Sequence, residues 1–308
     1  MRVVVTGGAG FIGANLCREL LTRPEVDEVV ALDDLSSGFA ANLDGAAAKL
    51  VEGSILDRGL LDDVVAGASS VVHLAARPSV PRSLLDPIAS HAVNATGTLY
   101  VLEAARAHGA HVVVASSSSV YGDTAVLPKH EELPTRPLSP YGVSKLATEG
   151  YALAHAASYG MSTLAFRFFN VYGPLQAAGH AYAAVVPAFV DAALRGQPVT
   201  VHGDGRQTRD FTFVATVTQV IADAVVGQVS CPGPVNLALG SRSSLLDLLD
   251  LLEQVLGRPV DRVHVDPRQG DVRDSQAASG ILRELFPQVS AVALERGLAE
   301  TVAWFQRG

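Results

Sequence analysis

Residues 6–13, T-G-G-A-G-F-I-G, are the stretch of sequence that decides the fold. A short apolar run leads into this stretch, and a helical pattern follows it. Gly8, Gly10 and Gly13 satisfy the spacing G-x-G-x-x-G, and Gly7 with the last two satisfies the variant G-x-x-G-x-x-G. Glycines in such a turn let a pyrophosphate approach the backbone N–H groups at the start of the helix. Strand, turn and helix together predict a dinucleotide-binding unit.

An acidic residue stands where such a unit holds the ribose of its cofactor. Asp33 ends the second predicted strand, 20 residues after Gly13. Its carboxylate would accept hydrogen bonds from the ribose hydroxyls and repel a 2′-phosphate. No lysine or arginine follows before Lys49, so we expect NAD rather than NADP. For the neighbouring Asp34, capping of the following turn is the ordinary alternative.

Short apolar runs alternate with helical patterns, as in an α/β protein with a parallel sheet. The first half is expected to hold strands at residues 2–6, 28–32, 50–53, 70–76, 111–115 and 163–168, and helices at residues 14–23, 87–108 and 140–158. The second half is expected to hold a loop at residues 170–184, strands at residues 199–202 and 233–240, and helices at residues 185–195, 214–226, 243–256 and 290–305.

We therefore predict an α/β fold, with a Rossmann-like doubly wound parallel sheet and a smaller, non-contiguous substrate-binding lobe. The predicted NAD-binding domain comprises residues 1–169 with about 211–240. The predicted lobe comprises residues 170–210 and 241–308.

The composition narrows the class of partner. The 308-residue chain has a formal charge of −8 and an isoelectric point near 5.6, which disfavours nucleic acid and anionic lipid as main partners. No apolar run approaches the roughly 20 residues that span a bilayer, and glycines interrupt the first run too early for a signal peptide. Cys17 and Cys231 match no metal spacing and are too few for a disulfide framework. We expect no metal site, no membrane association and a reduced, cytoplasmic setting.

A tyrosine and a lysine four residues apart follow a proline-rich loop. Tyr141 and Lys145 lie in S-P-Y-G-V-S-K, where a helix that begins near Pro140 would carry both side chains on one face. A fixed ammonium stabilises phenolate, so we expect a lowered pKa for Tyr141 and an acid/base role for the pair. The spacing alone also fits a core-edge aromatic beside a solvated charge.

Polar residues also occur in or after predicted strands. Four serines, residues 116–119, follow the strand that precedes V-Y-G, at the edge where open α/β sheets bind ligands; a polar turn is the alternative. His73 lies inside an apolar strand, and we interpret it as a buried, hydrogen-bonded residue rather than a ligand.

Several motifs occur together in a fixed order: T-G-G-A-G-F-I-G, Asp33, H-L-A-A, the serine run before V-Y-G, S-P-Y-G-V-S-K, R-F-F-N-V-Y-G-P and G-D-G-R-Q-T-R-D-F. This ordered set resembles the extended short-chain dehydrogenases/reductases and, within them, the nucleotide-sugar 4-epimerases of the UDP-galactose type. The resemblance extends over essentially the whole chain, through G-D-V-R-D-S. It implies tightly bound NAD and reversible 4-epimerisation of a UDP-sugar through a 4-keto intermediate, without net oxidation.

The resemblance also implies roles for individual residues. The catalytic residues would be Tyr141 as the base, Lys145 beside the ribose, and Ser117 at the sugar hydroxyl. The cofactor contacts would come from Gly7, Gly10, Phe11, Ile12, Gly13, Asp33, Ile55, Asp57 at the adenine, Leu74, Ala75, Ala76 and Asn94, with Tyr141 and Lys145. The substrate contacts would come from Ser79, Ser117, Ser118, Asn170, Gln176, Ala184, Val185, Arg209, Arg268, Asp271 and Ser275.

Among the substrate contacts, the resemblance places Asn170, Arg209 and Arg268 at the diphosphate and Asp271 at the uridine ribose. Arginine suits a phosphate because its planar fork makes paired, charge-assisted hydrogen bonds. For either arginine the alternative is a surface ion pair, for example with Asp210 or Asp266.

Single positions separate the related activities. Similar 4,6-dehydratases carry Asp and Glu directly after the active-site Ser/Thr, whereas this chain has Ser118 and Ser119. Similar UDP-glucuronate epimerases carry an arginine after V-Y-G-P, whereas residues 175–177 are L-Q-A, which disfavours a charged sugar. A 4-ketoreductase, a simple alcohol dehydrogenase and a non-catalytic NAD-sensing protein remain alternatives. The complete catalytic set disfavours the NAD sensor.

The size of the accepted sugar is expected to depend on Ser275. A bulky tyrosine at this position blocks an N-acetyl group in the family, whereas serine leaves room for it. The resemblance then favours UDP-N-acetylglucosamine 4-epimerases, with Gln176 and Ala184 at the acetyl group. We expect UDP-GlcNAc/UDP-GalNAc as substrates, and UDP-glucose/UDP-galactose with them.

Family members pair through two helices that correspond to residues 87–108 and 141–158. These segments carry small residues, among them Ala95 and Ala154. We therefore expect a homodimer held by a four-helix bundle.

Overall fold

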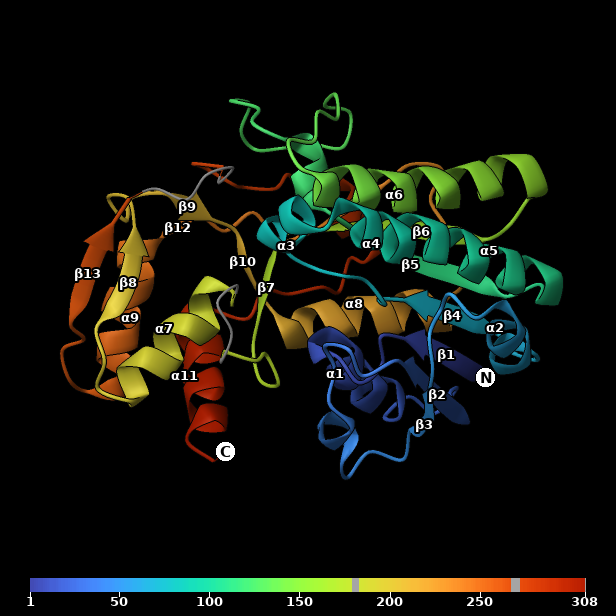
Figure 1. Ribbon diagram of the computed structural model, residues 1–308, viewed down its shortest axis with the longest axis horizontal. Helices are drawn as coiled ribbons and strands as arrows, with labels where there is room; N and C mark the ends of the chain where they lie inside the picture. The colour runs from blue at the N-terminus through green and yellow to red at the C-terminus, as the bar shows by residue number, and fades with distance from the viewer. Residues whose placement is uncertain (179–182, 267–271, 308) are drawn as a thin grey trace.

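A parallel sheet forms the centre of the larger part of the molecule in the computed structural model, which describes residues 1–178, 183–266 and 272–307 (Figure 1). Its seven strands run in the spatial order β11-β6-β5-β4-β1-β2-β3. Their bounds are β1 Arg2–Thr6, β2 Glu28–Asp33, β3 Lys49–Glu52, β4 Ser70–His73, β5 His111–Ser117, β6 Thr163–Phe168 and β11 Val235–Leu237. The strand order reverses between β1 and β4, which confirms the predicted doubly wound sheet.

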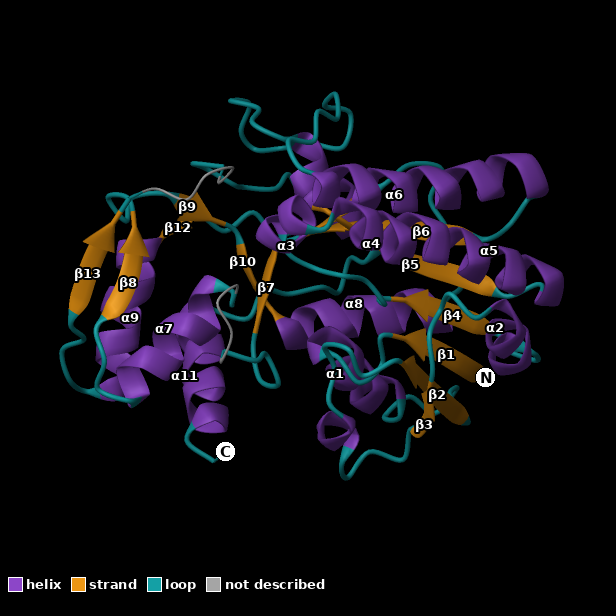
Figure 2. Cartoon of the chain, viewed as in Figure 1, coloured by secondary structure: helices purple, strands orange, loops and turns teal. Residues whose placement is uncertain are grey.

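Helices cover both faces of the sheet because its strands are apolar on both sides (Figure 2). Their bounds are α1 Phe11–Leu20, α2 Arg58–Val65, α3 Val80–Leu85, α4 Pro87–His91, α5 Gly97–His108, α6 Pro140–Tyr159, α8 Val214–Val226 and α10 Gly280–Leu285. Successive residues of β1 face opposite cores. Val3 and Val5 share a core with residues of α1, α8 and α10, whereas Val4 shares one with residues of α2 and α5.

A second apolar core belongs to the smaller part of the molecule. It is built mainly from α7 Val185–Leu194, β8 Val199–His202, α9 Leu245–Leu256 and α11 Leu294–Phe305. The exposed strand β13 Arg262–Val265 pairs with β8. Two short strand pairs also occur here: β7 Asn170–Tyr172 with β10 Phe211–Phe213, and β9 Thr208–Arg209 with β12 Ser243–Ser244. The first pair lies on the side of the large sheet and contributes Tyr172, Phe211 and Phe213 to this core (Figure 1). α8, β11 and α10 pack with the large sheet, and the division into two domains stays a prediction.

Some predicted boundaries are wrong because pairing between distant segments overrides local pattern. Residues 170–184 are not all loop, since Asn170–Tyr172 pairs in parallel with Phe211–Phe213. The helix expected from residue 243 begins only at Leu245, since Ser243–Ser244 pairs with Thr208–Arg209. The structure also contains elements that were not predicted, namely α2, α3, α10 and β13.

The helix expected at residues 87–108 is interrupted by a π-helical turn, Ala92–Thr96, between α4 and α5. Two single 3₁₀ turns, Ala40–Leu43 and Ser118–Tyr121, complete the helical elements of the described residues. None of the helices in this part of the chain combines the length and the apolar character that crossing a bilayer demands.

His73 is a buried, hydrogen-bonded histidine, as interpreted from the sequence. Its Nδ1 lies 2.7 Å from the hydroxyl of Thr6, and its Nε2 lies 3.0 Å from the hydroxyl of Thr98. Burial, with a smaller contribution from the charge of Lys145, lowers the pKa of His73 to about 3. The ring is therefore neutral at physiological pH.

A buried ion pair fixes helix α6 to the sheet. The Arg167 guanidinium on β6 donates two hydrogen bonds to the Glu149 carboxylate on α6, at 2.6 and 2.9 Å. The Ser116 hydroxyl on β5 donates to the same carboxylate at 2.9 Å. The guanidinium also lies 4.7 Å from the centre of the Tyr121 ring, whose hydroxyl donates to Asn236 on β11. Side chains from five elements thus converge near the serine run.

Candidate active site

The glycine turn after β1 is closely packed against its neighbours. Gly7 has a φ of +71°, and a Cβ atom on it would lie 2.7 Å from the amide nitrogen of Ala75. A Cβ atom on Gly13 would lie 2.1 Å from the carbonyl oxygen of Gly7. Only glycine therefore lets α1 begin directly on the turn.

The start of α1 meets the requirements of a phosphate site. The amides of Phe11, Ile12 and Gly13 make no hydrogen bond to any described residue, whereas the next amide, of Ala14, donates to Gly10. Unpaired first-turn amides at the positive end of a helix bind anionic oxygens. The glycine turn and α1 thus fit the pyrophosphate of a dinucleotide.

Asp33 lies at the carboxyl end of β2, beside this turn. Its carboxylate accepts the amides of Ala9 and Leu35, both at 2.9 Å. Burial raises the pKa of Asp33, and these two hydrogen bonds act in the opposite direction. Each carboxylate oxygen keeps a further lone pair, so Asp33 can still accept a ribose hydroxyl. Asp34 caps its turn through the amide of Ser36, at 3.0 Å.

The segment after β4, residues 74–76, runs over the glycine turn. The amides of Leu74 and Ala75 donate to the backbone and side chain of Thr6, at 3.0 and 3.3 Å. Asn94, in the π-helical turn, accepts the amide of Arg77 at 2.7 Å and donates to the Ser144 hydroxyl at 2.9 Å. Asn94 therefore ties this segment to α6.

The two residues predicted near the adenine also have structural roles. Ile55 is buried, and a Cβ atom on Gly97 would lie 2.5 Å from its Cδ1. The Asp57 carboxylate caps α2 by accepting the amide of Leu60 at 3.1 Å. Capping explains Asp57 without a ligand, so its contact with adenine stays a prediction.

The predicted catalytic residues meet at the carboxyl end of β5. Lys145, on α6, donates from Nζ to the carbonyl of Ala115 at 2.8 Å. Ser117 ends the same strand and lies near Tyr141 on α6, whose pKa it lowers. Helix α6 begins at Pro140 because the Ser139 hydroxyl accepts the amide of Gly142.

The expected lowering of the Tyr141 pKa by Lys145 is wrong for the chain alone. Burial raises the pKa of Tyr141, and the hydrogen bond with Ser117 offsets only part of this effect. Burial also lowers the pKa of Lys145 to about 8, because the ammonium loses its hydration. A protonated phenol and a predominantly charged lysine therefore coexist in this site at neutral pH.

The remaining serines surround Ser117. The Ser119 hydroxyl donates to Ser117 Oγ at 2.9 Å, and Ser118 begins the 3₁₀ turn. Ser79 caps α3 with a φ of +100°, a region that residues other than glycine seldom adopt. α3 in turn contacts the start of α6, since the Ser83 hydroxyl accepts the amide of Tyr141 at 3.0 Å.

Part of the predicted substrate side is assembled around Thr208. Asn170 donates its amide to the carbonyl of Asp210 at 3.2 Å, and Ser275 donates to the carbonyl of Thr208 at 3.1 Å. Arg209 lies between Thr208 and Asp210 in the sequence. Its guanidinium donates to the carbonyls of Thr208 and Arg273. The structure thus joins the segments of Asn170 and Ser275 to residues 208–210, which include Arg209.

The predicted acetyl pocket involves residues of different exposure. Gln176 donates to the carbonyl of Val171 at 3.2 Å, and its buried Oε1 has no partner among the described residues. Ala184 is exposed at the start of α7, with the half-buried Val185 after it. Arg268 and Asp271 lie outside the described residues.

Asp210 has a role that the sequence did not indicate. Its carboxylate accepts the amides of Gly240 and Ala277 and the hydroxyl of Ser241, at 2.8 to 3.1 Å. These three partners are neutral, whereas the sequence suggested Asp210 only as an ion-pair partner for Arg209. The sequence pattern could not indicate these hydrogen bonds, because the partners lie 30 or more residues from Asp210. Asp210 therefore holds three segments of the predicted substrate side together.

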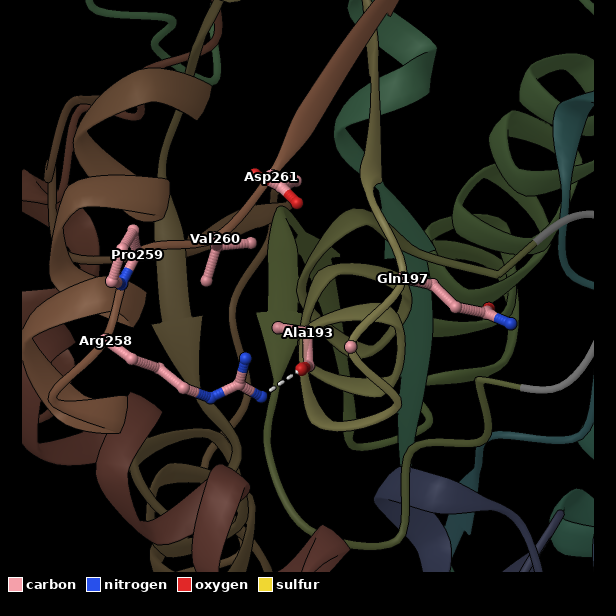
Figure 3. Close-up of a pocket in the computed structure, with 7 residues that line it drawn as sticks. Ala193, Gln197, Arg258, Pro259, Val260 and Asp261 are labelled. Carbon is pink, nitrogen blue, oxygen red and sulfur yellow. Dashed lines mark hydrogen bonds between the residues drawn. The ribbon is translucent and has the colours of Figure 1, made fainter.

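A small cavity elsewhere does not match the predicted site. Its volume is about 40 Å³, and it lies where Arg258 donates to the carbonyl of Ala193 at the end of α7 (Figure 3). Ligand pockets are roughly 300–1,000 Å³, so this cavity is a packing feature. Within the described residues no group of His, Cys, Asp and Glu side chains is arranged to hold a metal ion.

Comparison with known proteins identifies the family. The sequence model of the "NAD dependent epimerase/dehydratase family" matches residues 3–237. A UDP-glucose 4-epimerase from Mycolicibacterium smegmatis is 37% identical over 99% of both chains. The structure of a UDP-N-acetylglucosamine 4-epimerase from Methanobrevibacter ruminantium M1, in complex with UDP-N-acetylmuramic acid, superposes with a TM-score of 0.94 at 32% identity, covering 99% of this chain and 98% of that one.

A dehydratase is also similar. The structure of a dTDP-glucose 4,6-dehydratase from Streptomyces venezuelae, with NAD bound, has a TM-score of 0.92 at 31% identity and covers 100% of this chain and 98% of that one. The predicted family, fold and cofactor NAD are thereby confirmed. The roles of the individual site residues stay predictions.

Gly13→Ala should abolish stable NAD binding, because the added Cβ would meet the Gly7 carbonyl at 2.1 Å and displace α1 from the turn. We expect an affinity for NAD at least about tenfold lower, measured by calorimetry on protein freed of cofactor. Gly150→Ala is the control, since a Cβ at this exposed position on α6 meets nothing within 4 Å. Equal NAD affinity in Gly13→Ala and the wild type would contradict the role of the turn.

Proposed function

The chain belongs to the NAD dependent epimerase/dehydratase family, and we propose that it is a UDP-sugar 4-epimerase. The observation that carries this proposal is that Tyr141 and the buried Lys145 lie on α6 beside the end of β5, where Lys145 is bonded to Ala115 and Ser117 lowers the pKa of Tyr141. Such a group can remove a proton from a sugar hydroxyl and return it. An epimerase needs this reversibility, because proton and hydride both come back to the sugar.

The neighbours of Ser117 favour epimerisation over dehydration. Elimination of water needs an acid and a base beside the sugar, and Ser118 and Ser119 occupy the places of that pair. The Ser119 hydroxyl instead donates to Ser117, which orients the Ser117 oxygen. A hydroxyl group has too high a pKa to serve as the missing carboxylate.

Each catalytic residue has a task that follows from its surroundings. Tyr141 would take up and return the proton of the 4-hydroxyl. The Ser117 hydroxyl would hold the same sugar hydroxyl by a hydrogen bond. NAD, when bound, supplies a hydride acceptor and a positively charged ring. The burial that raises the pKa of Tyr141 also strengthens its response to nearby positive charge. Lys145, held by Ala115, would contribute such a charge and bind the ribose.

The proposed substrates are UDP-GlcNAc/UDP-GalNAc, together with UDP-glucose/UDP-galactose. Ser275 supports the N-acetylated pair, because it is small and is held against Thr208 beside Arg209. Gln176 supports it as well, because its unpartnered, buried carbonyl oxygen can accept an amide N–H. Arg209 would bind the diphosphate.

We also propose a homodimer, supported by an apolar face on α3, α4 and α6. Leu85, Ile88 and Val143 are 75, 81 and 52% exposed, a concentration unusual for a free surface. A groove of about 500 Å³ on α5 and α6, lined by Tyr100, Tyr151 and other residues, continues this face. A second copy can fill it by packing the same helices. The cytoplasmic setting stays a prediction.

Tyr141→Phe should retain NAD and the fold but lose turnover by about 10²–10⁴-fold, the usual contribution of a positioned acid/base group. Interconversion of UDP-GlcNAc and UDP-GalNAc, followed by chromatography, measures the loss. Ala157→Ser, at an exposed position of the same helix outside the proposed dimer face, is the control for effects on α6. Undiminished turnover in Tyr141→Phe would remove this residue from the mechanism.

Ser275→Tyr should reduce turnover of the N-acetylated pair at least about tenfold more than that of UDP-glucose and UDP-galactose, because the ring would fill the space of the acetyl group. Ser275→Ala keeps that space and should retain the wild-type ratio. Steady-state rates on both pairs give the comparison. A wild type that converts UDP-glucose but neither N-acetylated sugar would refute the assignment.

Ala154→Arg should yield a monomer of 32.1 kDa, because a long charged side chain would fill the groove that the second copy is proposed to occupy. Light scattering at micromolar concentration should give twice this mass for the wild type. Val263→Arg, at an exposed position on β13, should remain dimeric. A monomeric wild type would contradict the proposal.

A further inference from the structure

Lys129 is a buried lysine that the proposed mechanism does not use. The chain has only three lysines, Lys49, Lys129 and Lys145. Lys129 is 2% exposed, yet its ammonium makes no hydrogen bond or ion pair with any residue that the structure describes. A lysine side chain in so buried a position, with no acceptor for its ammonium among the described residues, is stabilised where a ligand supplies that acceptor.

Arg167, which lies near the same tyrosine ring as Lys129, has a carboxylate partner that Lys129 lacks among the described residues. Two cations face the ring of Tyr121: the Arg167 guanidinium at 4.7 Å and the Lys129 ammonium at 6.0 Å. Arg167 is neutralised by Glu149 through two hydrogen bonds. Among the described residues Lys129 has only the weak attraction of the ring, at the limit of a cation–π contact.

The backbone places Lys129 on the predicted substrate side. Its amide donates to Gln276 and its carbonyl accepts the amide of Ala278, both at 2.8 Å, so that it forms a bridge with Ala277. Ala277 is held by the Asp210 carboxylate, which follows Arg209 in the chain. Lys129 and Arg209 are therefore fixed to one segment, which also carries Ser275.

The charges around Lys129 favour an anion. Burial lowers the pKa of Lys129, the positive charge of Arg209 lowers it further, and the exposed Asp123 acts in the opposite direction. Two cations that repel each other, one of them without an acceptor in the described part of the chain, are stabilised by a bound anion between or beside them.

We propose that Lys129 binds an anionic oxygen of the nucleotide-sugar, beside Arg209. This inference rests on the function proposed above, and it adds a binding residue to that function. The oxygen belongs to the diphosphate or to a carboxylate on the sugar. Both sources share the same chemistry, an oxyanion that accepts a charge-assisted hydrogen bond.

Lys129→Met tests the proposal, because methionine keeps much of the apolar stem and removes the charge. Binding of UDP, UDP-GlcNAc and UDP-glucuronate is measured by calorimetry on NAD-loaded protein, and Lys49→Met, exposed on β3, is the control. A diphosphate contact predicts about tenfold weaker binding of all three ligands. A carboxylate contact predicts that only UDP-glucuronate is weakened. Unchanged binding of all three would overturn the proposal.

The melting temperature without nucleotide-sugar separates a binding role from a structural one. A lysine kept for a ligand predicts that Lys129→Met melts at the same or a higher temperature than the wild type. A large decrease, with equal loss of affinity for every ligand, would overturn the proposal in favour of a structural role.

Turnover by the wild type reports separately on the proposed function. Weakened UDP binding in Lys129→Met, with no turnover of any UDP-sugar by the wild type, would refute the epimerase and leave the anion contact standing. Normal turnover by the wild type, with unchanged ligand binding in Lys129→Met, would support the epimerase and refute the anion contact of Lys129.

Discussion

The buried Glu149–Arg167 pair is the interaction on which the geometry of the site depends. Glu149 lies on α6, one turn beyond Lys145, and Arg167 lies on β6. The carboxylate also accepts the Ser116 hydroxyl, one residue before Ser117. One carboxylate therefore sets the position of the helix that carries Tyr141 against the strand that carries Ser117. Breaking a buried pair of this kind typically costs about 3–5 kcal/mol, because the remaining charge stays buried without a partner.

The two sides of the site are held by different means. On the cofactor side, close backbone packing of Gly7 and Gly13 shapes the turn, and Asp33 fixes its neighbour Ala9. On the predicted substrate side, the chain is irregular, and Asp210 joins segments that are distant in sequence through hydrogen bonds to neutral groups. Tyr121 and Asn236 connect this side to the ion pair under the serine run.

The sequence was sufficient for features that arise from local chemistry. The glycine turn, the acid Asp33 and the helix from Pro140 each follow from neighbouring residues, and the doubly wound parallel sheet followed from the alternation of elements. The sequence was insufficient where partners are distant. The Asn236 amide pairs with Glu131, 105 residues away, and Asn170–Tyr172 becomes a strand only by pairing with Phe211–Phe213. The pKa of Tyr141 was also misjudged, because the spacing to Lys145 indicates a charge nearby but not how deeply the phenol is buried.

Isotopic labelling at carbon 4 tests the proposed hydride transfer most directly. UDP-GlcNAc that carries deuterium at carbon 4 is incubated with the NAD-loaded protein in ordinary water, and the product is analysed by NMR spectroscopy and mass spectrometry. A reversible transfer within one active site predicts UDP-GalNAc with the deuterium fully retained at carbon 4. Loss of the label to water, or its appearance at carbon 6 of a 4-keto-6-deoxy product, would contradict a 4-epimerase.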